Sequence, residues 1–189
     1  WPSIAPAPDG GIYFVWVENG QTIYAQRLDM DGFPVWGEEV RVNLDTTNAN
    51  RWYPVVAADA DGYLYVVWVD YRDDSTRRSD IYCQRLSPAG IHSWTGDVRV
   101  NTDVGWVQQT RPNIAIDDNG NAIVVWMDYR NGVANLYTQK LNAFGVSLWS
   151  SDVRVNQSAI VWWGRIVVDE SGHAVITWID DRTGQDEVY

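Results

Sequence analysis

Unrepeated aromatic and polar side chains in the connecting loops are the residues of this sequence best suited to ligand chemistry. Tryptophan offers a flat apolar face for stacking, and neighbouring asparagine and arginine side chains donate hydrogen bonds. This combination suits a sugar or a protein hot spot, with packing of the loops themselves as the alternative. The ligand-binding candidates are Asn50, Arg51, Trp52, Arg77, Arg78, Trp106, Trp162 and Trp163.

A second set of charged residues recurs along the chain, with an arginine two positions after each aspartate. Residues i and i+2 of an extended segment point the same way, so each aspartate can pair with its arginine. Because a catalytic group is needed only once, this recurrence favours structural ion pairs over a ring of ligands around a central ion or substrate. The pairs are Asp70 and Arg72, Asp128 and Arg130, and Asp180 and Arg182.

The remaining chemistry-bearing residues predict no catalytic or metal site. His92 and His173 are isolated and Cys83 is the single cysteine, so no nucleophilic triad or zinc site can be assembled from them. Segments 29–32 and 59–62 resemble calcium loops, but they lack the later acidic ligand that such a loop requires. We therefore expect no catalytic residue and no cofactor, with calcium as the alternative.

Internal repetition identifies the elements that position these residues. The segment Val-Arg-Val-Asn occurs at 40–43, 98–101 and 153–156, and a tryptophan series recurs at spacings of 52, 58 and 52 residues. Each repeat contains four short strands separated by turns, and the second strand is apolar on both faces, as in a sheet covered on both sides. The pattern predicts an all-β fold, a β-propeller of four-stranded antiparallel blades, with a solenoid of stacked sheets as the alternative.

The repeats divide the chain into one propeller region, 1–189, with about 3.7 repeats of roughly 54 residues. Their expected bounds are 1–46, 47–104, 105–157 and 158–189, and the last repeat lacks its end. We therefore expect part of a larger propeller or assembly rather than a ring that closes by itself.

Loop lengths vary on one face of this predicted fold. The distance from the first strand to the tryptophan of the second is 14 residues in every repeat, whereas that tryptophan precedes the tyrosine of the third strand by 8, 14, 11 and 11 residues. In an up-and-down blade the variable connections all emerge on the same face. Loops on a rigid framework usually carry binding, so we expect this variable face to bind the ligand.

Composition restricts the class of partner. The net charge is −11, and an acidic surface repels nucleic-acid phosphates and anionic lipids, so we expect neither partner. No apolar run approaches the roughly 20 residues that cross a bilayer. A single cysteine excludes an internal disulfide framework but not secretion, and we expect an extracellular or cell-surface location.

The motifs resemble a repeat found in large secreted bacterial proteins that form β-propellers. Its pattern is Pro-x-x-Ala-x-Asp-x-x-Gly, then Trp-x-Asp-x-Arg, then Tyr-x-Gln-Arg-Leu, and it matches Pro54–Leu86 and Pro112–Leu141. The implied fold is also similar to that of sialidases. The Asp box of sialidases is not reproduced, because Gly32, Gly90 and Gly145 are each followed by tryptophan one residue too late.

These observations favour a non-catalytic extracellular propeller that binds a protein or glycan, or that packs against identical subunits as a surface scaffold or filament. The alternative is a glycan-active enzyme of sialidase-like fold. An unrepeated cluster of carboxylates and arginines at the centre of the variable face would distinguish the enzyme from the scaffold.

Overall fold

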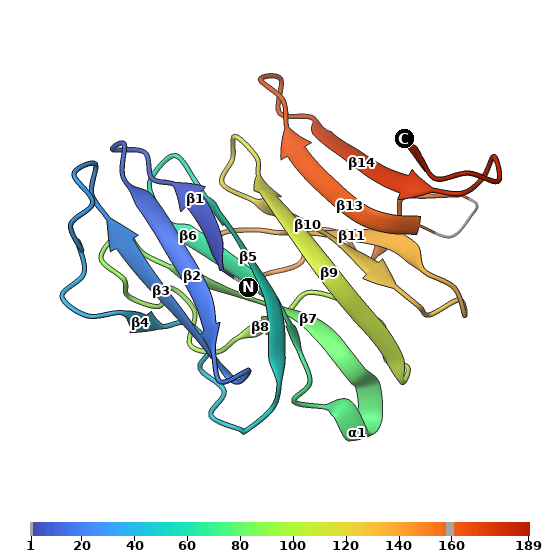
Figure 1. Ribbon diagram of the computed structural model, residues 1–189, viewed down its shortest axis with the longest axis horizontal. Coiled ribbons are helices and arrows are strands. Elements are labelled where there is room, and N and C mark those ends of the chain that lie inside the picture. Colours follow the sequence, from blue (N-terminus) through green and yellow to red (C-terminus); the bar gives the residue numbers. More distant parts are fainter. Residues whose placement is uncertain (1, 158–160) are drawn as a thin grey trace.

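The computed structural model describes residues 2–157 and 161–189, and the all-β prediction is confirmed. Its strands fall into four successive units (Figure 1). Unit 1 contains β1 (Ser3–Pro6), β2 (Ile12–Glu18), β3 (Thr22–Leu28) and β4 (Val40–Arg41). Unit 2 contains β5 (Arg51–Ala58), β6 (Leu64–Asp70), β7 (Arg78–Leu86) and β8 (Val98–Arg99). Unit 3 contains β9 (Val107–Ile116), β10 (Ala122–Asp128), β11 (Asn135–Leu141) and β12 (Val153–Arg154), and unit 4 contains β13 (Val161–Val168), β14 (Ala174–Asp180) and β15 (Glu187–Val188).

Strands pair antiparallel with their neighbours in chain order within each unit. The first strands, β1, β5, β9 and β13, follow one another across the molecule (Figure 1). Units 2 and 3 are also joined by a short parallel pairing of β7 with β9, in which Arg78 faces Val107 and Ser79 faces Gln108. The insertion that makes this contact contains α1 (Asp74–Arg77). No closed sheet forms among the described residues.

The hydrophobic core consists of three clusters, and each cluster lies between two successive units. The first joins Tyr13 and Val15 of unit 1 to Val66 and Trp68 of unit 2. The other two repeat this arrangement between units 2 and 3 and between units 3 and 4. All seven residues of β6 and of β10 are buried, which explains why these strands are apolar on both faces.

The repeated Val-Arg-Val-Asn segment has a structural cause. The side-chain oxygen of Asn43 accepts a hydrogen bond of 2.8 Å from the backbone N–H of Ile23, and the corresponding asparagines of units 2 and 3 make the same bond. These asparagines are 0–2% exposed, so the bond satisfies buried polar groups at the point where each short fourth strand ends.

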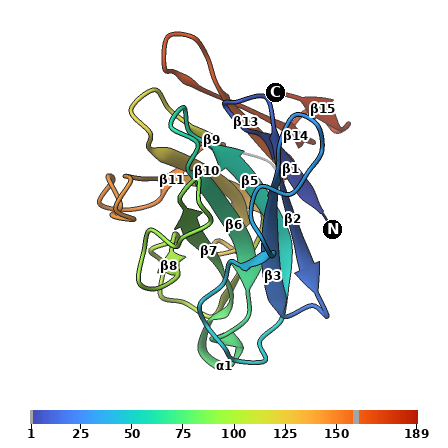
Figure 2. The ribbon, with the colours of Figure 1, turned by 90° about the vertical axis from the view of Figure 1, so that its left-hand side faces the viewer.

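A second tryptophan series links each unit to the next. The indole N–H of Trp36 donates to the carbonyl of Pro88, and that of Trp94 donates to the carbonyl of Ala143, both at 2.9 Å. Figure 2 shows the turns between first and second strands at the upper edge and α1 at the opposite edge, where the connections of variable length lie. No helix in the described part of the chain is long and apolar enough to cross a membrane.

Candidate functional site

Three residues at the same position of units 2, 3 and 4 have a left-handed backbone conformation. Their φ angles are 53° for Tyr53, 53° for Arg111 and 56° for Trp163. This region costs a residue other than glycine about 1–2 kcal/mol. Such strain is concentrated at functional sites, so the three positions identify a candidate site at the first strands.

The strain has a local cause in the sequence. Tyr53 and Arg111 precede Pro54 and Pro112, which have no N–H to donate to the sheet and are accommodated at bulges. The pairing of the first and second strands shifts register at this point in all three units. In unit 4 a glycine replaces the proline, and a Cβ atom on Gly164 would lie only 2.7 Å from a methyl carbon of Leu136. A bulge redirects its side chain, and here it turns three chemically different groups toward one cavity.

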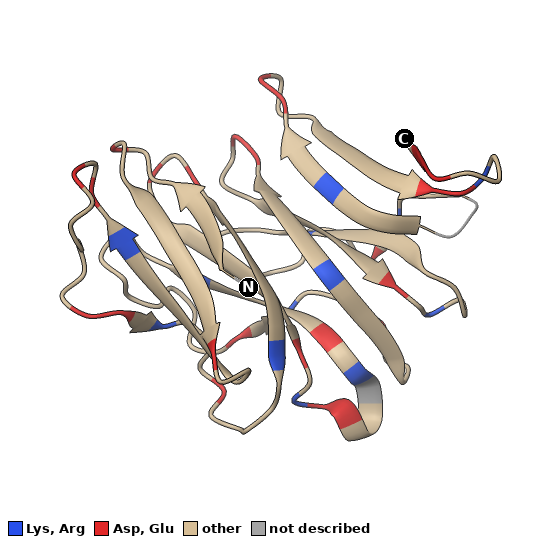
Figure 3. Cartoon of the chain, viewed as in Figure 1, with Lys and Arg blue, Asp and Glu red and all other residues tan. Residues whose placement is uncertain are grey.

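These groups converge on a cavity of about 640 Å³ between the first strands of the four units, which we call the central cavity. Its polar and aromatic lining residues are Ser3, Tyr53, Arg111, Asn113, Trp163 and Arg165, and prolines, a glycine and aliphatic residues form the rest of the wall. No carboxylate lines it among the described residues. The strands β5, β9 and β13 each contain one basic residue and no acidic residue. Figure 3 shows acidic residues at the turns.

Arg111 and Trp163 form the most specific contact in the central cavity. The guanidinium carbon of Arg111 lies 3.6 Å from the centroid of the Trp163 ring. The Nη1 atom of Arg111 is buried and has no hydrogen-bond partner in the described part of the chain. Trp163 is 52% exposed, so the pair combines a held cation, an unused donor and an accessible aromatic ring. A guanidinium of this kind can bind a carboxylate or hydroxyl group of a ligand.

An aromatic cleft of about 470 Å³ shares Tyr53 and Arg111 with the central cavity. It lies on the variable face, and its remaining lining residues are Trp52, Tyr71, Gln108, Thr110 and Tyr129. Trp52 and Tyr129 are 40% and 38% exposed. Aromatic faces beside amide, hydroxyl and guanidinium groups form the kind of surface that binds a sugar ring by stacking and hydrogen bonding.

The repeated aspartates lie next to this region but are fully occupied by the protein. Asp70 is buried and accepts hydrogen bonds from the Trp68 indole at 2.8 Å and from Arg72 at 2.7 Å. Burial alone raises the pKa of Asp70, but the hydrogen bonds of Arg72 and Trp68 and the charge of Arg72 outweigh it and lower the pKa. Hydrogen bonding from Arg182 lowers the pKa of Asp180 to about 2.

All three predicted aspartate–arginine pairs lie within bonding distance. Arg130 contacts Asp128 at 2.7 Å, and Arg182 also bonds to Asp180. Each of these aspartates also accepts a hydrogen bond from the strand tryptophan two residues earlier. These hydrogen bonds give the aspartates and arginines a structural role and leave few of their polar atoms available to bind a ligand.

The prediction for Arg51 requires correction. Its side chain is 0% exposed, its Nε donates to Asp70 at 2.9 Å, and its other nitrogens bond to Asp45 and to backbone carbonyls. Because the guanidinium is saturated by the protein, Arg51 anchors its loop. Asn50 and Trp52 stay exposed, and the Trp52 ring approaches Gly20 of unit 1, where a Cβ atom would lie 3.4 Å away.

The other candidates lie in two places. Trp163 lines the central cavity, whereas Trp162 is half-buried and packs against the third core cluster. Trp106 is 62% exposed, donates its indole N–H to the carbonyl of Asp74 at 3.0 Å, and lies under Arg78 with 4.8 Å between the guanidinium carbon and the ring centroid. Arg77 belongs to α1, and its side chain is not among those described.

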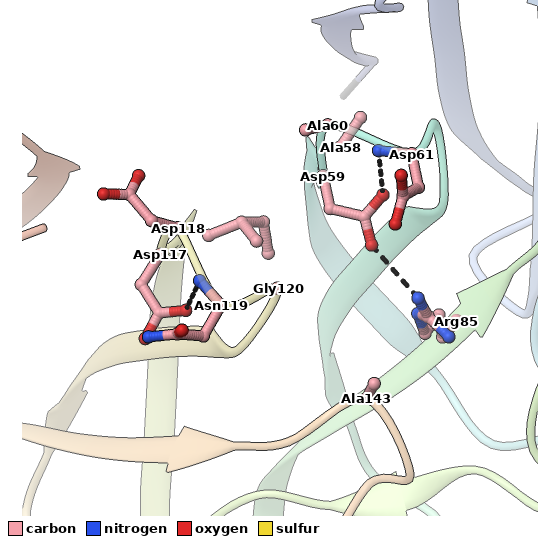
Figure 4. A pocket seen from close by; sticks show the side chains of 11 residues that line it. Ala58, Asp59, Ala60, Asp61, Arg85, Asp117, Asp118, Asn119, Gly120 and Ala143 are labelled. Carbon is pink, nitrogen blue, oxygen red and sulfur yellow. Dashed lines mark hydrogen bonds and ion pairs between the residues drawn. The ribbon is translucent and has the colours of Figure 1, made fainter. Parts of the chain in front are cut away.

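An acidic pocket of about 380 Å³ lies on the opposite face, between the first turns of units 2 and 3 (Figure 4). Its two buried carboxylates are already paired: Asp59 with Arg85 at 3.0 Å and Asp117 with Lys140 at 2.6 Å. Each also accepts backbone N–H groups of its own turn. The described residues contain no group of three or more His, Cys, Asp or Glu placed to hold a metal ion. These carboxylates therefore have a structural explanation.

Comparisons with known proteins show which fold this chain is similar to, but they assign it to no family. No family model and no curated protein matches the sequence. Among solved structures, an α-L-arabinanase of Penicillium chrysogenum complexed with arabinobiose has a TM-score of 0.66 at 14% identity, covering 99% of this chain and 63% of that one. A Hadza microbial sialidase has a TM-score of 0.67 at 12% identity, covering 99% and 43%. The GH93 α-L-arabinofuranosidase of Fusarium graminearum has a TM-score of 0.65 at 12% identity, covering 99% and 59%.

These neighbours are β-propeller glycosidases, which agrees with the predicted propeller fold. They contradict the expectation of a non-catalytic scaffold and favour the stated alternative, a glycan-active enzyme. The expectation was wrong because the strong sequence motifs recur in successive units for structural reasons, and such motifs carry no information about a single active site. The chain spans 43–63% of the length of these three neighbours.

Several residues of the candidate site were missed in the sequence, above all Tyr53 and Arg111. A usable signal was present, because they occupy one repeated position with unrepeated chemistry, directly before Pro54 and Pro112. Sequence alone did not show that this position is bulged and turned toward the central cavity.

Proposed function

We propose that this chain is part of an extracellular glycan-active enzyme and that its units are propeller blades. Three of these blades contain four strands each, and three strands of the fourth blade are described. Substrate binds in the central cavity and the adjoining aromatic cleft. The observation that carries this proposal is the convergence of Tyr53, Arg111 and Trp163 from one strained position in three successive units. The likeness of the fold to arabinan- and sialic-acid-processing enzymes supports it.

Each side chain has a distinct role in this proposal. Trp163 and Tyr53 stack against sugar rings, which present apolar C–H faces to aromatic side chains. Arg111 donates in-plane N–H groups to the ligand while Trp163 covers one face of its guanidinium. Because the ring and the cation hold each other in place before the ligand arrives, little side-chain entropy is lost on binding.

Hydrolysis of a glycosidic bond normally requires two carboxyl groups, one acid and one base or nucleophile. The described lining of the central cavity supplies neither. In this proposal the chain therefore binds and orients the sugar, and the two carboxyl groups come from outside that lining. The buried Asp70 and Asp128 are poor candidates because their oxygens are held by arginine and tryptophan.

The charge of the central cavity favours acidic sugars. The molecule carries a net charge of −11, yet the charged residues of the cavity lining are Arg111 and Arg165. Two arginines that line one cavity attract a carboxylate, most strongly at Arg111, which is partly buried, whereas Arg165 is exposed. We therefore expect glycans that carry a carboxylate or sulfate group to bind better than neutral ones.

A glycan array probed with the 189-residue chain, followed by titration calorimetry on the oligosaccharides it retains, tests the proposal. Trp163→Ala and Tyr53→Ala should each weaken binding by about tenfold, the loss of roughly 1.4 kcal/mol. Phe144→Ala is the matched control, because Phe144 is 82% exposed on a turn of the opposite face. Absence of binding to every glycan, or equal losses in the control, would overturn the proposal.

A further inference from the structure

An insertion in unit 2 makes a contact with unit 3 that is not repeated elsewhere in the described part of the chain. It contains α1, and residues 78–79 that follow it pair in parallel with residues 107–108 at the start of β9 (Figure 1). The buried hydroxyl of Ser79 donates to the carbonyl of Gln109 at 2.8 Å, which fastens the insertion to unit 3. The contact is therefore well defined, although it lies outside the repeated framework.

Trp106, which directly precedes β9, is held in one orientation by this insertion. Its indole N–H donates to the carbonyl of Asp74 in α1 at 3.0 Å. The guanidinium carbon of Arg78 lies 4.8 Å from the centroid of the Trp106 ring. Arg78 is exposed, and its backbone φ of 71° lies in the left-handed region, which is strained for a residue other than glycine. We call Trp106 and Arg78 the outer platform.

The ring of Trp106 is exposed to a degree that a purely structural role does not require. Trp36 and Trp94 also donate their indole N–H to a carbonyl of another unit, and they are 5% and 8% exposed. Trp106 is 62% exposed. A tryptophan that only fastened the insertion would gain stability by burying its large apolar ring. The exposed ring of Trp106 is therefore available to a ligand.

The outer platform adjoins the aromatic cleft. Gln108 lines the cleft and lies two residues after Trp106, so the Cα atoms of the two residues are at most about 7 Å apart. Residues 107–110 of β9 separate Trp106 from Arg111 and extend over about 13 Å, at roughly 3.3 Å per residue. A single sugar ring does not span this distance, whereas a chain of several sugars does.

We propose that the outer platform binds a distal sugar of the same glycan whose other units occupy the aromatic cleft and the central cavity. A sugar ring stacks on the exposed ring of Trp106, and Arg78 donates to a carboxylate or sulfate group of that sugar. This inference rests on the proposed function and extends it, because it specifies the substrate class as an acidic polysaccharide rather than a short oligosaccharide. The insertion in unit 2 then has a role in recognising the length of the substrate.

Titration calorimetry of the 189-residue chain with a dimer and an octamer of galacturonic acid tests the proposal. Both probes carry carboxylates, but only the octamer is long enough to reach from the central cavity to the outer platform. We expect the octamer to bind more tightly than the dimer. Trp106→Ala should weaken octamer binding by about tenfold and leave dimer binding unchanged. Phe144→Ala is the matched control, since Phe144 is an exposed aromatic residue on a turn of the opposite face.

Two further variants separate ligand binding from a structural role. Trp106→Phe keeps an aromatic ring but loses the N–H that bonds to Asp74, so it should retain most of the octamer affinity. Arg78→Gln should weaken binding of the galacturonic acid octamer more than binding of a neutral arabinose octamer. If Trp106 only fastened the insertion, Trp106→Phe would behave like Trp106→Ala, and dimer and octamer would lose affinity alike. That result would overturn the proposal.

The failure of this inference is distinguishable from the failure of the proposed function. If octamer binding depends on Trp163 but not on Trp106, the proposed function stands and the outer platform is not a binding site. If neither galacturonic acid probe binds the wild-type chain, the inference is overturned, and the glycan array decides the proposed function separately. Thermal unfolding establishes that each variant is folded.

Discussion

The guanidinium carbon of Arg111 lies 3.6 Å from the centroid of the Trp163 ring, although 52 positions separate the two residues in the sequence. Both have a left-handed backbone at the same position of neighbouring units. The contact holds a cation against the wall of the central cavity, and the Nη1 atom of Arg111 has no hydrogen-bond partner among the described residues. The repeats therefore position the residues of this candidate site without repeating their chemistry.

Replacing Arg111 should change the selectivity for charged glycans. A hydrogen bond to a charged group contributes about 1.5–3 kcal/mol, so Arg111→Gln should weaken the binding of a carboxylate-bearing oligosaccharide by about 10–100-fold. Arg111→Lys should lose less, because it keeps the charge but not the planar donor pair. Neutral arabino-oligosaccharides provide the comparison by calorimetry. Equal losses for acidic and neutral ligands would contradict the charge argument.

The strained position of Tyr53 predicts a separation of stability from binding. Glycine adopts a φ of 53° without steric cost, whereas alanine does not, so Tyr53→Gly should be about 1 kcal/mol more stable than Tyr53→Ala. Both variants remove the aromatic ring and should bind glycans equally weakly. Thermal unfolding and calorimetry measure the two quantities. An alanine variant as stable as the glycine variant would show that the position is not strained in solution.

Strand and cavity tryptophans should differ sharply in their contribution to stability. Trp126 is 0% exposed and bonds to Asp128, so Trp126→Ala should lower the free energy of unfolding by about 3–5 kcal/mol. Trp163→Ala removes a half-exposed ring and should cost less than about 1 kcal/mol. Urea denaturation followed by circular dichroism measures both. Equal losses would place Trp163 in the core and remove it from the site.

Asp70 should make folding stability depend on acid pH. Its pKa is lowered in the folded chain, so its stabilising contribution is fully present above the ordinary value of 3.8 and is lost as pH falls through the lowered value. Removing one partner of this buried network, as in Asp70→Asn, should cost about 3–5 kcal/mol at neutral pH.

In Asp70→Asn the free energy of unfolding should also fall less steeply as the pH is lowered. Urea midpoints measured between pH 5 and pH 2.5 test this, with the exposed Asp118→Asn as control. A wild-type profile no steeper than that of Asp70→Asn would contradict the assignment.

The all-β strand pattern of the units could be predicted from the sequence alone. Strands such as β6 and β10 were predictable because all their residues are buried between neighbouring sheets, and such burial requires a continuous apolar run. The repeated Asn43 segment was equally informative, since its buried side chain satisfies a backbone N–H in the same way in each unit. A sequence motif that recurs in this way therefore reflects a backbone geometry that recurs in each unit.

The location of the candidate site, in contrast, depends on how the units pack against one another. Arg51 and Arg111 both lie shortly before a proline of a first strand in the sequence. The guanidinium of Arg51 is fully hydrogen-bonded inside its loop, whereas that of Arg111 stacks on Trp163 in the central cavity. The difference arises from bulges that redirect single side chains and from the stacking of units that brings them together. Residues joined by such long-range contacts are far apart in the sequence and belong to no common motif. Their proximity therefore follows only from the packing of one unit against the next.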